Sequence, residues 1–171
     1  MSRFFTSRPA WLALLVFVLG SLSACGFQLR GAASLPEAMQ KTWLQPADPT
    51  SPFTRELELL LRANGVELVD QPGEEAATLR ITRERITRRA LTISGDARVR
   101  EFELVFDLRF TLVAPGGDVL LDSESLRLQR DFQFDEQEIL SAASEEELIR
   151  ENLRREMAAA LIRRLEAFGR T

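Results

Sequence analysis

The single cysteine of the chain, Cys25, is the residue whose position offers the clearest chemistry. It closes the run Leu-Ser-Ala-Cys behind an apolar stretch over residues 10–19, which follows two arginines and a proline. A basic start, an apolar middle and a small-residue end are typical of a secretory signal peptide. The apolar stretch is shorter than the roughly 20 residues of a membrane-spanning helix, so an uncleaved anchor is the weaker interpretation. We therefore expect residues 1–24 to be removed.

The pattern of leucine, two small residues and cysteine is similar to the lipobox of bacterial lipoproteins. This similarity implies that the Cys25 sulfur carries a diacylglycerol group and that cleavage makes Cys25 the first residue, with an acyl group on its nitrogen. Two or more acyl chains hold a protein stably at a bilayer, whereas one chain holds it weakly. The alternative is an ordinary signal peptide in which a cysteine stands here by chance. No cofactor other than this covalent lipid is expected.

The composition argues against catalysis and against a metal site. The chain has no histidine and no tyrosine, and acylation would remove its only thiol. The commonest general base, the commonest metal ligands and the most reactive nucleophile would then be missing. Carboxylate pairs such as Asp131 and Asp135 occur, but their spacing does not distinguish a glycosidase pair from solvated surface. We predict that the protein is not an enzyme and has no catalytic residues.

The charge of the chain argues against nucleic acid as a partner. Removal of residues 1–24 takes two arginines and no acid with it, so the formal net charge falls from −4 to −6. A nucleic-acid-binding domain is usually strongly basic. With no second cysteine, no intramolecular disulfide can form, and the fold depends on its apolar core.

One segment departs from this acidic balance. Residues 80–100 hold seven arginines and only two acids, Glu84 and Asp96. A hairpin turn is predicted at residues 94–96, and the two arms of the hairpin concentrate the arginines near its tip. Because the planar guanidinium group suits bidentate contact with phosphate, the cluster can bind a phosphorylated ligand. The alternative is that these arginines only solvate a strand face and pair with acids on neighbouring strands.

A single folded domain is expected over residues 41–171, after a lipidated start and tether over residues 25–40. A short strand is predicted over residues 41–45. A helix follows, with Ser51 as its N-cap and Pro52 at its first position, and Asn64-Gly65 ends it.

Three longer strands are predicted over residues 78–93, 99–113 and 119–134. The middle strand is typical of a half-buried antiparallel strand. One face carries Phe102, Leu104, Phe106, Leu108, Phe110 and Leu112, and the other carries Glu101, Glu103, Asp107, Arg109 and Thr111. In the first of the three, the apolar positions change parity, and this predicts a bulge near residues 83–90. The order of elements becomes strand, helix, three strands and a last helix.

Residues 135–143 are one predicted start of the last helix, and Ser144 is the better one, because Ser144 and Glu147 form a capping box. The helix is predicted to end at Gly169. The apolar faces of strands and helices must bury one another. We therefore predict an α+β two-layer sandwich, in which two helices pack on a four-stranded, mostly antiparallel sheet. Trp43 and the phenylalanines of the strands are expected in its core.

Four segments of the chain resemble the family of the lipopolysaccharide-assembly lipoprotein LptE. They are residues 25–31, 51–55, 61–70 and 161–165, and the most specific are the lipidated start and the helix ending in Asn-Gly-Val-Glu-Leu. The resemblance implies two helices on a four-stranded sheet. It also implies a plug inside the outer-membrane β-barrel LptD, which helps the barrel to assemble and helps to deliver lipopolysaccharide to the cell surface.

The location follows from the same resemblance. Gly26 after the cysteine, rather than aspartate, fits export to the outer membrane under the usual sorting pattern of lipoproteins. The domain would then face the periplasm or lie inside the barrel lumen. The rival hypothesis is a free-standing, periplasmic-facing lipoprotein that binds or carries an amphiphile between its helices and its sheet.

Ligand contacts of this family lie on basic residues at the arginine-rich hairpin and near the start of the last helix. In this chain the matching helix region, residues 140–147, contains no base, so only the hairpin arginines are carried over. The candidate lipopolysaccharide-binding residues are Arg83, Arg85, Arg88, Arg89, Arg98 and Arg100.

The lipid anchor gives the first testable prediction. Cells grown with labelled palmitate should incorporate the label into the wild-type protein and not into a Cys25→Ala variant, since the thiol is the predicted acceptor. The measurement is the label in the immunoprecipitated protein. Equal labelling of the two proteins, or no labelling of the wild type, would remove the anchor.

Overall fold

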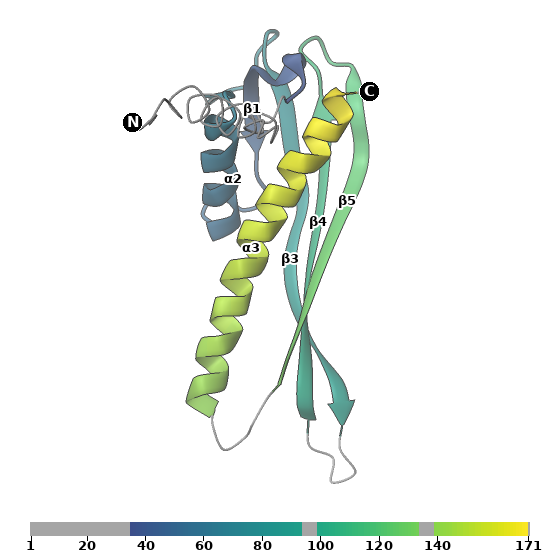
Figure 1. The fold of residues 1–171 in the computed structure, drawn as a ribbon. Coiled ribbons are helices and arrows are strands. Elements are labelled where there is room, and N and C mark those ends of the chain that lie inside the picture. The colour runs from purple at the N-terminus through teal and green to yellow at the C-terminus, as the bar shows by residue number, and fades with distance from the viewer. Residues whose placement is uncertain (1–34, 94–98, 134–138, 171) are drawn as a thin grey trace, which may run out of the picture. The chain divides into compact units, whose positions relative to one another are not determined.

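Two helices cover one face of a five-stranded sheet (Figure 1). A computed structural model of the chain describes residues 35–93, 99–133 and 139–170; within these ranges the side chains at 92–93, 99–100 and 139–141 are not described. The elements are a 3-10 helix η1 (Glu37–Met39), strand β1 (Lys41–Gln45), helix α2 (Pro52–Ala63), and strands β2 (Glu67–Val69), β3 (Ala77–Ile93), β4 (Val99–Val113) and β5 (Val119–Gln133), followed by helix α3 (Ile139–Gly169).

The sheet order is β2-β1-β3-β4-β5. Strand β1 runs parallel to both β2 and β3, because α2 crosses over between β1 and β2, while β3, β4 and β5 form an antiparallel meander. The two-layer α+β prediction is confirmed, but the strand count is corrected from four to five. The fifth strand, β2, has only three residues and gains its ladder from β1, so its own sequence carries little signal.

Helix α2 has the ends that its sequence predicts. The Ser51 side chain accepts a hydrogen bond from the Thr54 backbone N–H at 2.9 Å, and Pro52 occupies the first helical position. Gly65 has φ +84°, a left-handed conformation that glycine adopts without strain. Helix α3 begins at Ile139 rather than at Ser144. The helix therefore starts five residues before the predicted capping box, and Ala142 in this added part is buried.

Strand β3 contains the predicted irregularity, on both sides of the expected segment. Its pairing with β4 shifts between Ile81 and Arg83, again between Ala90 and Thr92, and a third time between Thr92 and Ile93. The first shift leaves Thr82 outside the regular ladder and reverses the parity of the residues that follow. Leu79, Ile81 and Ile86 can therefore all face the helices although their spacing breaks alternation.

The core lies between the sheet and the helices. Apolar residues at alternate positions of β4 are buried there, and Phe53 of α2 meets Phe106 edge-on, with ring centroids 5.5 Å apart. The core also includes Met39, which is fully buried, so the end of the predicted tether over residues 25–40 takes part in the packing. The apolar pattern of β4 thus predicted its buried face correctly.

Trp43 is not part of this core, contrary to the prediction. It is half-buried and lies on the opposite face of the sheet, in register with Val69 and Thr78. The neighbouring Thr42 takes the inward position, where it is buried and donates a hydrogen bond from Oγ1 to the Met39 carbonyl at 2.7 Å. A five-residue strand leaves the choice of face to its partners, because both parities contain apolar side chains.

Glu84 is a charged residue at an inward position of β3. Its Oε2 accepts a hydrogen bond from Ser51 Oγ at 3.1 Å, which joins the sheet to the N-terminus of α2. Burial raises the pKa of Glu84, and the nearby Asp48 adds to the effect, while the hydrogen bond from Ser51 and the charge of Arg154 oppose it. The ionised carboxylate is thus less stable here than in water.

A Glu84→Gln variant should be more stable than the wild type at pH 7. The folded state binds the Glu84 proton more tightly than the unfolded state, so ionisation of Glu84 costs stability as pH rises above its ordinary value of 4.5. Denaturant unfolding at pH 7 and at pH 4 measures the difference. The stability gain of the variant over the wild type should be smaller at pH 4 than at pH 7. A gain that is larger at pH 4 than at pH 7 would contradict this account.

Candidate functional site

The pleat of β3 separates the candidate arginines into two sets. Successive side chains of a strand point to opposite faces, so Arg83, Arg85 and Arg89 lie on the face away from the helices, and Arg88 points towards them. We call the face away from the helices the outer face. It is defined by the register partners of these three arginines on β4, which are Arg109, Asp107 and Glu103.

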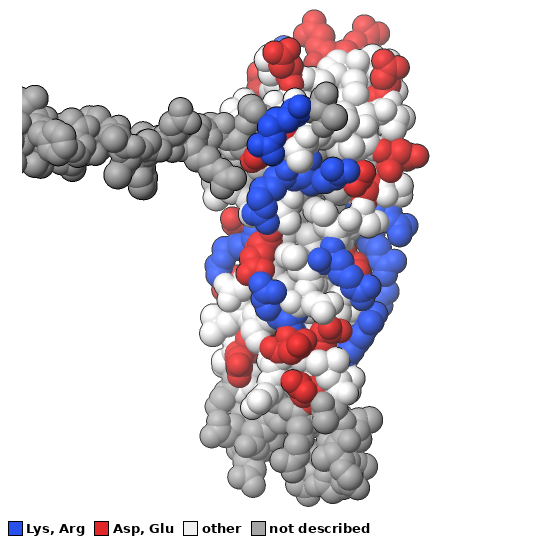
Figure 2. Space-filling view, turned by 45° about the vertical axis from the view of Figure 1, so that its right-hand side comes forward, with Lys and Arg blue, Asp and Glu red and all other residues white. Residues whose placement is uncertain are grey.

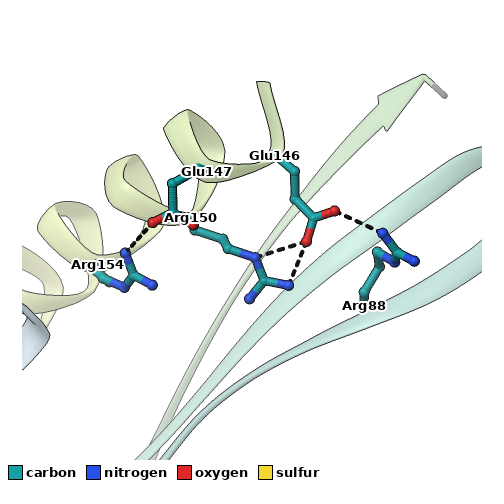
Figure 3. A network of polar contacts seen from close by, with 5 residues as sticks. All are labelled: Arg88, Glu146, Glu147, Arg150 and Arg154. Atoms are coloured by element: carbon teal, nitrogen blue, oxygen red, sulfur yellow. Dashed lines mark hydrogen bonds and ion pairs between the residues drawn. The ribbon is translucent and has the colours of Figure 1, made fainter. Parts of the chain in front are cut away.

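Arg88 is engaged within the fold. Its Nη1 lies 2.9 Å from Glu146 Oε2 of α3 (Figure 3). Its guanidinium also lies 4.4 Å from the centre of the Phe102 ring. Phe102 stacks in turn on Phe132 of β5, with centroids 5.8 Å apart. The side chain of Arg88 is 46% exposed and that of Glu146 only 16%. This arginine therefore holds the last helix against the sheet.

Glu146 is shared between two arginines. Arg150, one turn later on α3, donates hydrogen bonds from Nε and Nη2 to Glu146 Oε1 at 2.9 and 2.6 Å (Figure 3). Burial works against ionisation of Glu146, but the hydrogen bonds and charges of Arg150 and Arg88 outweigh it and lower its pKa. Beside this network, Arg154 pairs with Glu147 at 3.0 Å. The acidic start of α3 is thus neutralised from within the domain.

The same helix is tied to the sheet at two further points. Arg130 of β5 contacts Glu156 at 2.6 Å, and Arg164 contacts Glu124 of β5 at 2.9 Å. Both β5 residues occupy inward positions, opposite Leu104 and Phe110 of β4. Charged residues at inward positions therefore line the seam between α3 and the sheet.

The outer face holds a basic area in the middle of the three long strands. Arg83 lies directly opposite Arg109, and the next row contains Arg85, Asp107 and Arg127. Arg127 Nε is 3.6 Å from Asp107 Oδ1. Sequence reasoning placed Arg109 on the polar side of its strand but missed it and Arg127 as site residues. Only the cross-strand register brings them beside Arg83.

Acidic residues take over nearer the hairpin. Arg89 stands opposite Glu103, and Glu103 stands opposite Asp131 of β5. The described basic area is therefore centred in mid-sheet, whereas the sequence suggested the hairpin tip. Arg98 lies outside the described residues, and Arg100 is described only by its backbone in β4. Figure 2 shows basic side chains mixed with acidic ones across the middle of the surface that it presents, and acidic ones at its upper end, which is the end away from the hairpin.

The other candidate site residue, Cys25, also lies outside the described residues. Within the described ranges, no group of three or more acidic, histidine or cysteine side chains is placed to hold a metal ion. In the same ranges no helix combines the length and the apolarity that crossing a membrane requires.

Comparison with known proteins identifies the family. The model of the family described as "LptE: Lipopolysaccharide-assembly" matches residues 39–165, which run from the end of η1 into the last turns of α3. The chain belongs to the LptE family. This confirms the resemblance read from the sequence, and the family name describes assembly rather than a reaction.

Two relatives illustrate the match. The LPS-assembly lipoprotein LptE of Pectobacterium atrosepticum is 29% identical over 144 residues, covering 84% of this chain and 77% of the relative. The LPS-assembly lipoprotein LptE of Yersinia enterocolitica is 29% identical over the same length, covering 84% of this chain and 69% of the relative.

Solved structures share the fold. Lipoprotein B of Nitrosomonas europaea matches with a TM-score of 0.71 at 26% identity, covering 84% of this chain and 92% of that one. The rare lipoprotein B of Shewanella oneidensis matches with a TM-score of 0.66 at 24% identity, covering 74% and 94%. The two-layer architecture of these LptE-like lipoproteins is thus the architecture of this chain.

The contact between Arg88 and Glu146 can be tested by a double-mutant cycle with Arg88→Gln and Glu146→Gln. We expect a coupling energy of about 0.5–1 kcal/mol at pH 7, the upper part of the range for partly exposed pairs. The lowered pKa of Glu146 means that the coupling is present above the ordinary value of 4.5 and is lost as pH falls through the lowered one.

The exposed pair of Arg155 and Glu151 on α3 is the matched control, with an expected coupling of roughly 0.3–0.5 kcal/mol. Denaturant unfolding of the variants gives both values. Equal coupling in the two cycles would mean that Arg88 does not hold α3 to the sheet.

Proposed function

We propose that the protein is an outer-membrane lipoprotein that plugs the β-barrel LptD, helps it to assemble and assists lipopolysaccharide transport to the cell surface. The observation that carries this proposal is the family match over residues 39–165, which contains almost the whole folded domain. The relatives are named for lipopolysaccharide assembly. The role is structural and binding, and not enzymatic.

The lipid anchor at Cys25 is part of this proposal, with an S-diacylglycerol and an N-acyl group. Leu35, the first described residue, already packs against the core. Cys25 lies ten positions earlier in the chain, and ten fully extended residues span at most about 35 Å. An acylated cysteine would therefore keep the domain at the bilayer that contains the barrel.

The surface of the domain is compatible with a plug. A barrel lumen is polar, so a protein inside it needs a charged exterior around an independent core. Here the alternate apolar side chains of β4 from Leu104 to Leu112 are buried beneath two helices, and the outer face carries both arginines and acids. The domain can thus be surrounded by polar walls without exposing its core.

Lipopolysaccharide carries phosphate groups, and arginines of the outer face are suited to contact them. Of the six candidates, Arg83, Arg85 and Arg89 are available on this face, whereas Arg88 is held by Glu146 and Phe102. We therefore retain Arg83, Arg85 and Arg89, and keep Arg98 and Arg100 as expectations from the sequence.

The rival function is that of a free-standing carrier with an amphiphile between helices and sheet. That space is filled by side chains, since Phe53, Phe106, Leu153 and Met157 are all fully buried in one cluster. An acyl chain could enter only by displacing them. The plug is therefore the better supported of the two functions.

Co-purification tests the proposal. Full-length protein extracted from outer membranes in mild detergent should travel with one large β-barrel protein, and site-specific crosslinkers on the outer face should reach that barrel. A Cys25→Ala variant is the control for the contribution of the anchor. A protein that leaves the outer membrane without any barrel would exclude the plug and favour the carrier.

A further inference from the structure

An open hollow of about 270 Å³ lies on the outer face over β3, β4 and β5. It lies where three strands bring basic side chains together. The lining residues are Arg83, Asp107, Leu108, Arg109, Ser125, Leu126 and Arg127.

The charges around this hollow are not balanced. Asp107 is its only acid, and Asp107 is already 3.6 Å from Arg127. Among the residues that the structure describes, neither Arg83 nor Arg109 has an ion-pair partner within 4 Å. Two guanidinium groups thus border the hollow with no counter-charge from the described chain.

These two arginines are directly opposite each other in the ladder. Like charges in directly opposite positions destabilise a sheet. The repulsion between Arg83 and Arg109 therefore destabilises the folded state. An anion bound between the two guanidinium groups would replace this repulsion with attraction.

The bulge at Thr82 is what creates the pair. Ile81 is opposite Phe110, so regular pairing would place Thr82 opposite Arg109 and turn Arg83 towards the helices. The extra residue moves Arg83 to the outer face instead, and Thr82 Oγ1 donates a hydrogen bond to the Arg109 carbonyl at 3.2 Å. Bulges often re-aim a side chain next to a functional site.

We propose that this hollow is a binding site for a phosphate group, held between Arg83 and Arg109 with Arg127 at its border. Guanidinium groups bind phosphate oxygens through paired, charge-assisted hydrogen bonds. Ser125, opposite Arg109 on β5, adds a hydroxyl donor. The volume lies just below that of typical small-molecule pockets, which suits one tetrahedral anion rather than a peptide segment.

The group can come from a phosphorylated lipid or from free phosphate. The assignment of the phosphate group to a lipid rests on the proposed role in lipopolysaccharide transport. The inference that the hollow binds phosphate does not depend on that role. The site shares Arg83 with the candidates carried over from the sequence, whereas its other two arginines, Arg109 of β4 and Arg127 of β5, lie outside the arginine-rich segment of residues 80–100.

The experiment uses full-length protein in a non-ionic detergent, titrated with inorganic phosphate against chloride at constant ionic strength. Thermal unfolding and calorimetry measure the binding. Phosphate should raise the Tm of the wild type, and Arg109→Gln or Arg83→Gln should weaken binding about tenfold, which equals about 1.4 kcal/mol. Arg163→Gln, an exposed arginine of α3, is the control for loss of one charge and should bind as wild type does.

A second readout separates binding from folding. Without phosphate and at low ionic strength, Arg109→Gln should be at least as stable as the wild type, because it removes the opposed pair. Phosphatidylcholine vesicles with phosphorylated or dephosphorylated lipid A then identify the source. If only the phosphorylated vesicles bind, and binding needs Arg109, the group belongs to a lipid; if inorganic phosphate alone binds, it is free.

Three outcomes would overturn the site: no phosphate-specific rise in Tm, an equal rise in wild type and Arg109→Gln, or a loss of barrel co-purification in Arg109→Gln with phosphate binding unchanged. The last outcome would assign the arginines to a protein interface. Phosphate binding is measured on the isolated protein, and the plug is tested by co-purification with the barrel. Either result can fail while the other succeeds, so the phosphate site and the plug function are tested separately.

Discussion

Strand β3 pairs with β4 along most of its length, and the places where this pairing shifts determine which side chains meet the helices. The shift after Ile81 lets Leu79, Ile81 and Ile86 share one buried face despite their irregular spacing. The same shift brings Glu84 and Arg88 to the inner face. Core, helix contacts and outer surface all depend on this single register, because a slip of one residue exchanges the two faces of a strand.

On the inner face, charged groups complete what apolar packing begins. Glu84 accepts a hydrogen bond from Ser51 at the start of α2, and Arg88 reaches Glu146 of α3. The hydrogen bonds and charges of Arg150 and Arg88 outweigh the desolvation of Glu146, whereas the hydrogen bond from Ser51 offsets only part of the desolvation of Glu84. The two contacts join the sheet to the N-terminal parts of α2 and α3, outside the central apolar cluster.

On the outer face the sheet has no second layer among the described residues, and its surface is a pattern of charges. Arg83 and Arg109 face each other without a counter-charge, while Asp107 stands with Arg127. A lipoprotein held at the bilayer by its acylated start would present this face to whatever surrounds it. That face has a basic centre and a more acidic end near the hairpin.

The sequence alone determined the ends of α2, the buried face of β4 and the two-layer class, because caps and apolar periods are local properties. The anchor at Cys25 stays a prediction from the sequence. The sequence could not assign the arginines of β3 to faces, place Trp43, or join Arg109 and Arg127 to Arg83. These depend on the position of a bulge and on the register between strands that are far apart in the chain. Only the tertiary structure decides them, since pairing with β4 selects which parity of β3 is buried.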